Sequence, residues 1–205
     1  MGSLTYEKSD EKRVYETYEW DNTWLERAYD EDVDRVLYIG DSISCQSRRI
    51  ITEKAEDKLL FDGFGTSKGI DNPYFDDAIS IFAKQQPKRL AVLFNNGLHG
   101  WHLDDETEYK EHYEKKIEFL LKEFKDTPLF IVLTTHIADE DREKRVIKRN
   151  KVALEIAEKY NLPVIDLYAV TVANPDTLSP DGVHLLREGY DLLAEEILRV
   201  LKEYI

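Results

Sequence analysis

The sequence has little cysteine and no apolar run of membrane-spanning length. Its only thiol, Cys45, excludes an internal disulfide bond. No segment approaches the roughly 20 apolar residues that a helix needs to cross a bilayer, and residues 1–13 do not resemble a signal peptide. We therefore expect a soluble protein without membrane insertion. The same absences favour the cytoplasm, although a signal peptide upstream of Met1 would not be visible in this sequence.

Positive charge is also scarce. Lys and Arg together number 28 against 42 Asp and Glu, which gives a formal net charge of −14. A charge of that sign repels phosphate backbones and anionic lipid, so nucleic acid is not an expected partner. The 5 histidines are scattered without a Cys pair or a His-x-x-x-His spacing, and no phosphate-binding Gly-x-x-x-x-Gly-Lys-Ser/Thr loop occurs. We therefore expect neither a metal site nor a bound cofactor.

The length of 205 residues predicts one domain with a substantial core. Residues 1–32 are polar with interspersed aromatic side chains, a composition that predicts a peripheral arm packed across the outside of the main domain. Residues 33–205 then form the main domain itself.

From residue 35 onward, apolar runs alternate with segments of helical periodicity. Apolar runs without internal alternation are typical of parallel strands that are buried on both faces. The sequence therefore predicts an α/β fold, a three-layer α/β/α sandwich around a doubly wound parallel sheet of about five strands. The expected strands are 35–40, 58–65, 89–97, 128–135 and 162–168, and the expected helices are 47–57, 73–86, 106–124, 141–160 and 187–205. In such sheets, ligands bind beyond the carboxyl ends of the strands.

Three polar clusters stand where such a ligand site is expected. Residues 40–44, Gly-Asp-Ser-Ile-Ser, follow the first strand, where a serine can present its hydroxyl and N–H at a helix start; an ordinary N-cap uses the same residue types. Residues 95–102 bring two amides, two imidazoles and an indole to the end of the third strand. Residues 179–184 contain an Asp-x-x-His spacing, in which a carboxylate can accept the Nδ1–H of an imidazole and leave Nε2 as a base.

Together the clusters supply the parts of a serine acyl-transfer site. A serine hydroxyl needs a base and a group that orients the base, because an unassisted hydroxyl is a poor nucleophile near neutral pH. Ser42, His184 and Asp181 fit these three roles, and the loop 95–99 offers hydrogen-bond donors for an oxyanion. Ser44, two residues beyond Ser42, is the rival nucleophile.

The two end clusters resemble the first and last blocks of the GDSL, or SGNH, hydrolases. "IGDSIS" begins at Ile39 and "SPDGVHLLREGYDLLAEEI" begins at Ser179, so the resemblance covers residues 33–203. It implies a flavodoxin-like α/β/α fold and ester hydrolysis without a metal or an organic cofactor. On the matching positions it implies that Ser42 is the nucleophile and one oxyanion donor through its N–H, that His184 is the base, and that Asp181 orients His184.

The family's second block offers a glycine N–H to the oxyanion. Here the matching stretch is "DGFGTSKGID" at 62–71, in which the register is open and Gly65, Ser67 and Gly69 are all candidates.

The third block departs from the usual Gly-x-Asn-Asp of the family. The corresponding residues 97–100 are Gly-Leu-His-Gly, so that His99 stands where the asparagine donor is expected. A neutral imidazole N–H can donate a hydrogen bond, and the role then passes to His99. The alternative donor is Asn96, or less favourably Asn95, at the strand end. Trp101 is expected to line the substrate pocket or to pack within the loop.

These observations predict a serine esterase that hydrolyses a carboxylic ester through an acyl-enzyme. The expected partner is a small-molecule or carbohydrate ester, and the acyl group is expected to be short, such as acetyl, because the sequence shows no long apolar lid. Two alternatives on the same fold stay open: an acyltransferase, which shares the first half-reaction, and a non-hydrolytic module that binds esters or carbohydrates. The oligomeric state is also open.

Overall fold

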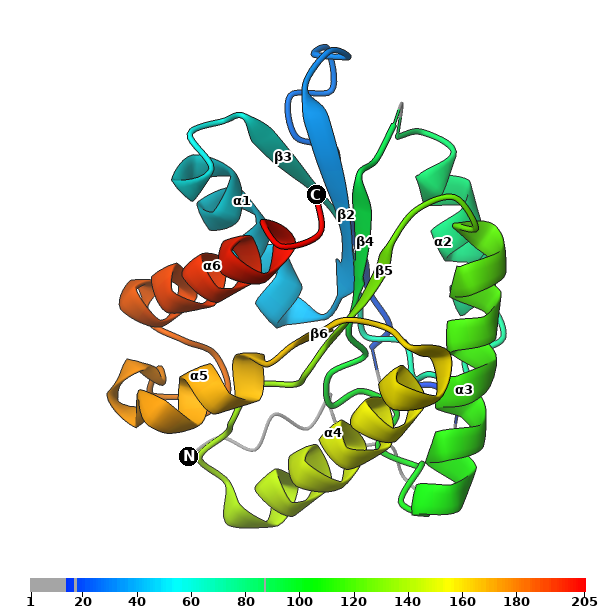
Figure 1. The fold of residues 1–205 in the computed structure, drawn as a ribbon. Coiled ribbons are helices and arrows are strands. Elements are labelled where there is room, and N and C mark those ends of the chain that lie inside the picture. Colours follow the sequence, from blue (N-terminus) through cyan, green and yellow to red (C-terminus); the bar gives the residue numbers. More distant parts are fainter. Residues whose placement is uncertain (1–13, 17, 87) are drawn as a thin grey trace.

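A mixed sheet of six strands lies at the centre of the molecule (Figure 1). The computed structural model describes residues 14–16, 18–86 and 88–205. The strands are β1 (Asp21–Trp24), β2 (Asp34–Gly40), β3 (Leu59–Thr66), β4 (Ala91–Phe94), β5 (Leu129–Val132) and β6 (Val164–Ile165). Their order across the sheet is β1-β3-β2-β4-β5-β6; β2 to β6 are parallel, and β1 pairs antiparallel with β3.

Helices cover both faces of this sheet. One layer consists of α1 (Ser42–Lys54), α5 (Leu167–Ala173) and α6 (Arg187–Leu201), and the other of α2 (Phe75–Ala83), α3 (Glu106–Glu123) and α4 (Glu140–Tyr160) (Figure 1). A short 3-10 helix, Pro175–Thr177, lies between α5 and α6. The predicted three-layer α/β/α fold is therefore confirmed. None of the helices in the described ranges is long and apolar enough to cross a membrane.

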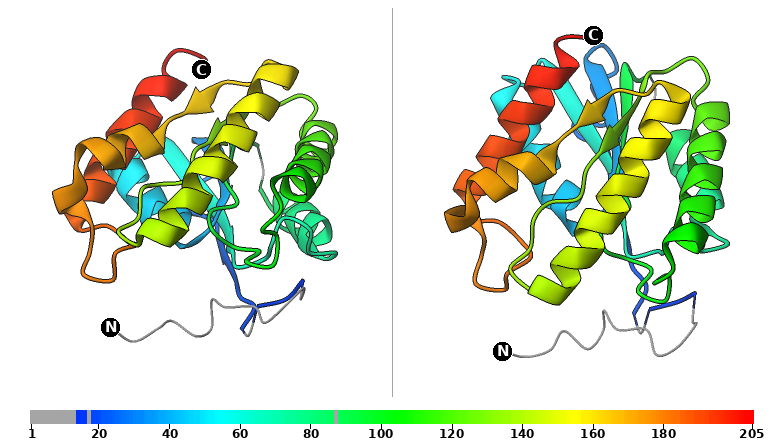
Figure 2. Two further views of the ribbon diagram at one scale, coloured as in Figure 1. Left: turned by 90° about the horizontal axis from the view of Figure 1, so that it is seen from below. Right: turned by 60° about the horizontal axis from the view of Figure 1, so that its bottom comes forward.

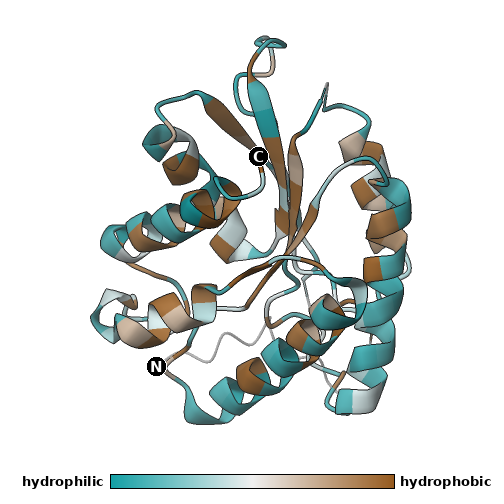
Figure 3. Cartoon of the chain, in the orientation of Figure 1, coloured by the Kyte–Doolittle hydropathy of each residue, from teal (hydrophilic) through white to brown (hydrophobic). Residues whose placement is uncertain are grey.

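The parallel strands are buried on both faces, which explains why their apolar runs show no alternation. In β2, Leu37 and Ile39 pack beneath α2, α3 and α4, whereas Val36 and Tyr38 pack beneath α1 and α6. The central strands are mostly coloured as apolar, and the helices show mixed colouring, as expected when one face of each helix is buried (Figure 3). Two apolar cores thus fix the sheet between its helical layers.

Two of the boundaries that differ from those predicted are set by an aspartate that caps a helix. Helix α1 begins at Ser42 and not at residue 47, because the Asp41 side chain accepts a hydrogen bond from the Ile43 N–H and caps the helix. The expected strand 162–168 is shortened to β6, because Asp166 caps α5 through the N–H of Ala169. In both places an aspartate inside or beside an apolar run starts a helix earlier than the hydrophobic pattern indicates.

The segment 18–32 supplies the strand β1, which the sequence analysis did not separate from the arm. All four β1 side chains are exposed, so the strand has no apolar face that the pattern could reveal. Its backbone pairs with β3 from Asp21 opposite Thr66 to Trp24 opposite Gly63. Residues 1–13 of the predicted arm lie outside the described residues, and the division of the chain at residue 32 stays a prediction.

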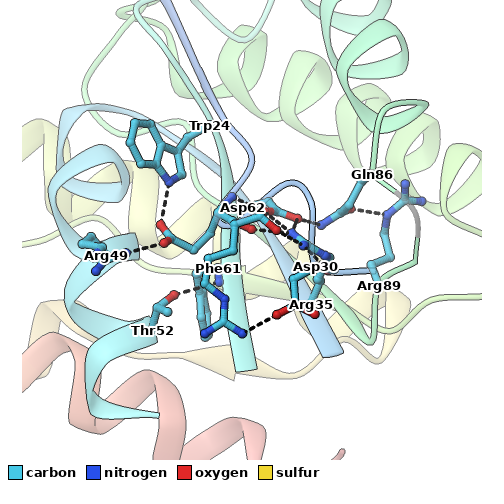
Figure 4. Close-up of polar contacts among 11 residues, drawn as sticks. Trp24, Asp30, Arg35, Arg49, Thr52, Phe61, Asp62, Gln86 and Arg89 are labelled. Carbon is cyan, nitrogen blue, oxygen red and sulfur yellow. Dashed lines mark hydrogen bonds and ion pairs between the residues drawn. The ribbon is translucent and has the colours of Figure 1, made fainter. Parts of the chain in front are cut away.

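A buried ion pair fastens the chain just after β1 to the sheet (Figure 4). Arg35 Nη1 lies 3.0 Å from Asp62 Oδ1, and both side chains are 0% exposed. Asp62 Oδ1 accepts the N–H of Glu26 at 2.8 Å. The Arg35 guanidinium donates to the carbonyls of Glu26, Arg27 and Asp30 at 2.8, 3.0 and 2.7 Å. Buried charges are tolerated only when they are paired and hydrogen-bonded, and these contacts meet that need.

Candidate active site

The first sequence cluster places Ser42 at the carboxyl edge of the sheet. Strand β2 ends at Gly40, Asp41 caps α1, and Ser42 is the first residue of that helix. The N–H groups of a first helical turn have no acceptor within the helix, and the helix dipole makes this end electropositive. The Ser42 main chain is therefore suited to face a negative charge.

The side chains of Ser42, His184 and Asp181 form a hydrogen-bonded series. His184 Nε2 lies 2.8 Å from Ser42 Oγ, and His184 Nδ1 lies 2.7 Å from Asp181 Oδ2. An ionised carboxylate only accepts, so Nδ1–H donates to Asp181 and the unprotonated Nε2 accepts the hydroxyl proton of Ser42. Ser42 and His184 are 142 positions apart in the sequence. The fold thus brings together the three residues that the end clusters singled out.

The loop that carries Asp181 keeps its carboxylate ionised. Burial alone would raise the pKa of Asp181, but hydrogen bonds from the Val183 N–H, the Ser179 hydroxyl and His184 outweigh it and hold this pKa well below its usual value. The Ala138 N–H donates to the Gly182 carbonyl at 2.8 Å and ties the loop to the end of β5. The carboxylate is therefore charged and held in place at neutral pH.

The rival nucleophile, Ser44, is turned away from this series. Its hydroxyl donates to the Asp41 carbonyl at 2.7 Å, and the residue is 3% exposed. A hydroxyl that is buried against its own helix start does not reach a substrate. The geometry favours Ser42.

A small cavity of about 30 Å³ adjoins Ser42. His99 and Trp101, from the loop between β4 and α3, line it on one side, and Thr135 and Val183 are also part of its wall. This volume is on the order of one or two water molecules. A larger groove of about 490 Å³ lies at the opposite, amino ends of the strands and is lined in part by Lys54, Leu198 and Ile205. Because Ser42 lies at the carboxyl ends of the strands, this groove is not part of the same site.

The two asparagines of the third cluster serve the structure of the strand ends. Asn95 Nδ2 donates to the Val132 carbonyl at 2.7 Å, and Asn96 Nδ2 donates to the Lys68 carbonyl at 3.1 Å. Both residues are buried. Of the three candidate donors Asn95, Asn96 and His99, it is His99 that lines the cavity beside Ser42.

The candidates of the second block are not brought to the cavity. The Ser67 N–H donates to the Trp20 carbonyl at 3.1 Å, and the Ser67 hydroxyl accepts the Trp20 N–H at 2.9 Å. Gly65 lies within β3 beneath α1, where a Cβ atom would overlap the Sγ atom of Cys45. Gly69 packs closely against Gly100. Ser67 thus bonds the chain before β1, and Gly65 allows α1 to pack closely on β3.

Trp101 is fixed by two arginines of α4. The guanidinium carbons of Arg142 and Arg145 each lie 4.9 Å from its ring centroid, and Arg145 Nη1 donates to its carbonyl at 2.9 Å. The indole is thus both a packed loop residue and a part of the cavity wall. In the described ranges, no group of three or more His, Cys, Asp and Glu side chains is arranged to hold a metal ion.

Glu16 lies beside the cavity residue His99, and the sequence alone does not reveal this. Its Oε1 lies 2.8 Å from Nδ1 of His99, and the residue is 7% exposed. Seen with the carboxyl ends of the strands brought forward, the start of the described chain crosses this edge of the sheet (Figure 2). No motif surrounds Glu16 in the sequence, and its contact spans 83 positions. A polar segment of this kind carries no pattern that would reveal such a contact.

Gly97→Ala is expected to impair the site. Gly97 has φ of +63°, and a Cβ atom there would overlap Asp41 Oδ2, the carboxylate that caps α1. The left-handed backbone alone costs about 1 kcal/mol for alanine, and the overlap displaces Asp41 and with it Ser42. We expect a lower melting temperature and a slower reaction of Ser42 with a phosphonate ester.

Gly100→Ala is the matched control for this substitution. Gly100 also has a positive φ, +76°, but the nearest atom to its added Cβ is Cα of Gly69 at 3.1 Å. Equal effects of the two substitutions on Ser42 reactivity would show that the backbone conformation, and not the space beside Asp41, limits the site.

Solved structures with this fold belong to lipolytic proteins and esterases. A member of the lipolytic protein G-D-S-L family from Veillonella parvula superposes with a TM-score of 0.67 at 18% identity and covers 83% of this chain and 99% of that one. An acetyl xylan esterase superposes with a TM-score of 0.64 at 18% identity and covers 83% and 100%. The chain therefore has the α/β/α fold of these proteins. No family model matches the sequence.

A curated relative is the O-acetyltransferase OatA of Staphylococcus aureus. It is 23% identical over 169 residues, which make up 82% of this chain and 25% of OatA. The chain thus spans about a quarter of the length of the curated relatives that it matches.

Proposed function

We propose that this protein is a serine esterase that hydrolyses a carboxylic ester through an acyl-enzyme on Ser42. The observation that carries the proposal is the hydrogen-bonded series from Ser42 through His184 to Asp181 at the carboxyl edge of the sheet. A nucleophile, a base and a group that orients the base are the parts that acyl transfer requires. The shared fold of the G-D-S-L protein and the acetyl xylan esterase supports it.

The reaction proceeds in two steps. Ser42 Oγ attacks the ester carbonyl carbon while its proton passes to His184 Nε2, and the carbonyl oxygen becomes an oxyanion. When the tetrahedral intermediate collapses, the alkoxide leaves with the proton from His184 as an alcohol, and the acyl group stays on Ser42. Water then attacks the acyl-enzyme and gives a proton to His184; when this second intermediate collapses, the bond from Ser42 Oγ to the acyl carbon breaks, His184 returns the proton to Ser42, and the acid is released. Asp181 keeps the imidazole in the tautomer that both steps need.

The oxyanion is stabilised by the Ser42 N–H at the start of α1 and by a donor from His99. We propose on this basis that the chain belongs to the GDSL, or SGNH, hydrolases as a variant with Gly97-Leu98-His99 in the third block. His99 lines the cavity beside Ser42, whereas Asn95 and Asn96 bond main-chain carbonyls. A single such donor contributes about a hundredfold to a thousandfold in rate.

The preferred acyl group is short, with acetyl as the first candidate. The cavity beside Ser42 is small, about 30 Å³, which favours a short acyl group over a long one. An acetylated carbohydrate is the proposed substrate class, supported by the fold shared with an acetyl xylan esterase and by the similarity to an O-acetyltransferase.

Acetyl transfer to an acceptor other than water is the second candidate function. The similarity to OatA favours it, because a transferase and an esterase share the first half-reaction. Adding a sugar acceptor to the reaction separates the two. An acetylated acceptor formed faster than acetate would make the protein a transferase, and acetate alone would make it an esterase.

A serine-directed phosphonate tests the proposal against a module that only binds esters. An enzyme of this kind takes up one phosphonyl group at Ser42, which peptide mass spectrometry locates. Absence of label on folded protein, together with no release of acid from acetylated sugars, would leave a binding module as the function.

Asp181→Asn is expected to lower kcat by about ten-thousandfold, as is typical when this carboxylate becomes an amide. The amide can donate to Nδ1 and thereby move the imidazole proton to Nε2, so that His184 no longer accepts the Ser42 proton. Ser179→Ala is the control, because it removes one hydrogen bond to Asp181 and leaves the carboxylate. Hydrolysis of p-nitrophenyl acetate measures both variants. Similar losses in the two would contradict the orienting role of the carboxylate.

A further inference from the structure

The N-terminal segment contributes a carboxylate to the candidate oxyanion donor. Glu16 Oε1 contacts His99 Nδ1 at 2.8 Å, and the two side chains are 3% and 11% exposed. The ring of His99 lines the cavity beside Ser42. A second carboxylate–imidazole pair therefore adjoins the Ser42–His184–Asp181 series and approaches it from another part of the chain.

The contact determines which ring nitrogen can serve the oxyanion. Glu16 occupies Nδ1, so only Nε2–H can be the donor. If the Glu16 carboxylate and the His99 ring share a single proton, that proton lies on Nδ1 facing the carboxylate, and Nε2 is unprotonated. If the two groups hold two protons, one lies between Oε1 and Nδ1 and the other on Nε2. The carboxylate and the imidazolium then have a net charge of zero. A carboxylate beside Nδ1 favours this second state, because its opposite charge stabilises an imidazolium.

We propose that Glu16 is a positioning residue that orients His99 and keeps its Nε2 protonated as a donor toward the Ser42 cavity. The inference deepens the proposed esterase function and rests on it for its catalytic consequence. It also makes the N-terminal segment a part of the active site, where the sequence indicated a peripheral arm.

Several contacts hold Glu16 in place. Its N–H donates to Glu19 Oε1 at 3.0 Å, and Glu19 Oε2 in turn accepts from the Asn72 amide at 3.4 Å. The Trp20 ring lies edge-on to the His99 ring, with centroids 5.9 Å apart and planes at 83°. The main chain of Trp20 is fastened to Ser67 in both directions. These hydrogen bonds hold Glu16 beside His99, close to the start of β1.

Charged groups from the same segment and from two further elements surround the pair. Glu19 on the same segment carries a negative charge that faces both Glu16 and His99. Lys68, which follows β3, carries a positive charge that faces Glu19. Arg149 of α4 is 4% exposed and donates to the His99 carbonyl at 2.7 Å. The main chain of His99 is thus fixed from α4 and its ring from the N-terminal segment. Both holds restrict the movement of His99.

A double-mutant cycle on Glu16 and His99 tests the proposal. His99→Ala is expected to lower kcat for p-nitrophenyl acetate by about a hundredfold. Glu16→Ala is expected to lower kcat by about tenfold or more with KM within about twofold, and to have no further effect in the His99→Ala background. Glu16→Gln is expected to restore part of the rate, because its amide can donate to Nδ1 and leave the proton on Nε2.

Tyr18→Ala is the matched control. Tyr18 lies on the same segment, is 69% exposed, and is expected to leave kcat unchanged. Equal losses of kcat for Glu16→Ala alone and in the His99→Ala background would overturn the proposal, because Glu16 would then act by another route.

Nitrogen-15 NMR of histidine-labelled protein gives a readout that needs no turnover. We expect the His99 resonances, assigned by their loss in His99→Ala, to show protons on both ring nitrogens at pH 7.5, and to show a neutral ring in Glu16→Ala. A bare Nε2 in the wild type would overturn the proposal. A doubly protonated His99 in a protein that hydrolyses no ester would instead contradict the esterase function and leave the Glu16–His99 pairing in place.

Discussion

Ser42→Ala is expected to lower kcat for p-nitrophenyl acetate hydrolysis by about a millionfold, as removal of a serine nucleophile does elsewhere. No other hydroxyl takes its place, because the neighbouring Ser44 is buried and donates to the Asp41 carbonyl. The folded structure should be kept, since the substitution removes one atom at the protein surface. Circular dichroism and the hydrolysis rate check the two halves of this expectation.

Ser44→Ala is the control that distinguishes the two serines of the first cluster. It removes a single hydrogen bond to the main chain, which contributes about 1 kcal/mol to stability, and it leaves the Ser42–His184 contact in place. We expect hydrolysis within about threefold of the wild-type rate. Full activity in Ser42→Ala together with lost activity in Ser44→Ala would move the nucleophile by two residues and refute the site described above.

Arg35→Met is expected to lower the free energy of unfolding by about 3–5 kcal/mol, the usual cost of leaving one buried charge without its partner. Asp62 is 0% exposed and would keep its hydrogen bonds from the Glu26 N–H and from Gln86, but lose the cation that balances it. The carbonyls of Glu26, Arg27 and Asp30 would also lose the hydrogen bonds from the guanidinium (Figure 4). Urea denaturation followed by tryptophan fluorescence measures the change.

Arg199→Met provides the comparison for an exposed cation. Arg199 bonds Glu196 and Glu203 on the surface of α6, where its side chain is 59% exposed. Exposed ion pairs add little to stability because water and salt screen them. The unfolding midpoint of Arg199→Met should stay close to that of the wild type. A midpoint for Arg35→Met as high as that of Arg199→Met would mean that the buried pair does not stabilise the fold.

The fold was predictable from the sequence wherever burial dictates the residue pattern. The strands β2, β4 and β5 are buried on both faces, and their continuous apolar runs announced a parallel sheet with helices on both sides. Strand β1 gave no such signal, because it lies at the edge of the sheet with all four side chains exposed and is held by backbone pairing with β3. Backbone hydrogen bonds leave no trace in the side-chain pattern.

The candidate site was predictable only in part, for a related reason. Ser42, Asp181 and His184 stand in short stretches whose spacing has a chemical meaning, and the fold brings them into contact. The sequence could not decide whether His99 or Asn96 is the better candidate for the oxyanion donor. The structure favours His99 because the Asn96 amide already donates to the Lys68 carbonyl, and no local spacing encodes that contact. Glu16 depended on the path of the N-terminal segment across the sheet edge, and that path is a property of the tertiary structure.

The pairing of Ser42 with His184 has a consequence for how the protein acquires activity. Ser42 opens α1 and His184 precedes α6, and these two helices pack side by side in one apolar core. Contacts between residues so distant in sequence form late, because closing a long loop costs entropy before the contact can stabilise it. A nascent chain therefore carries Ser42 as an unassisted hydroxyl until its C-terminal helix has docked. Ester hydrolysis by Ser42 would therefore begin only when the whole domain has folded.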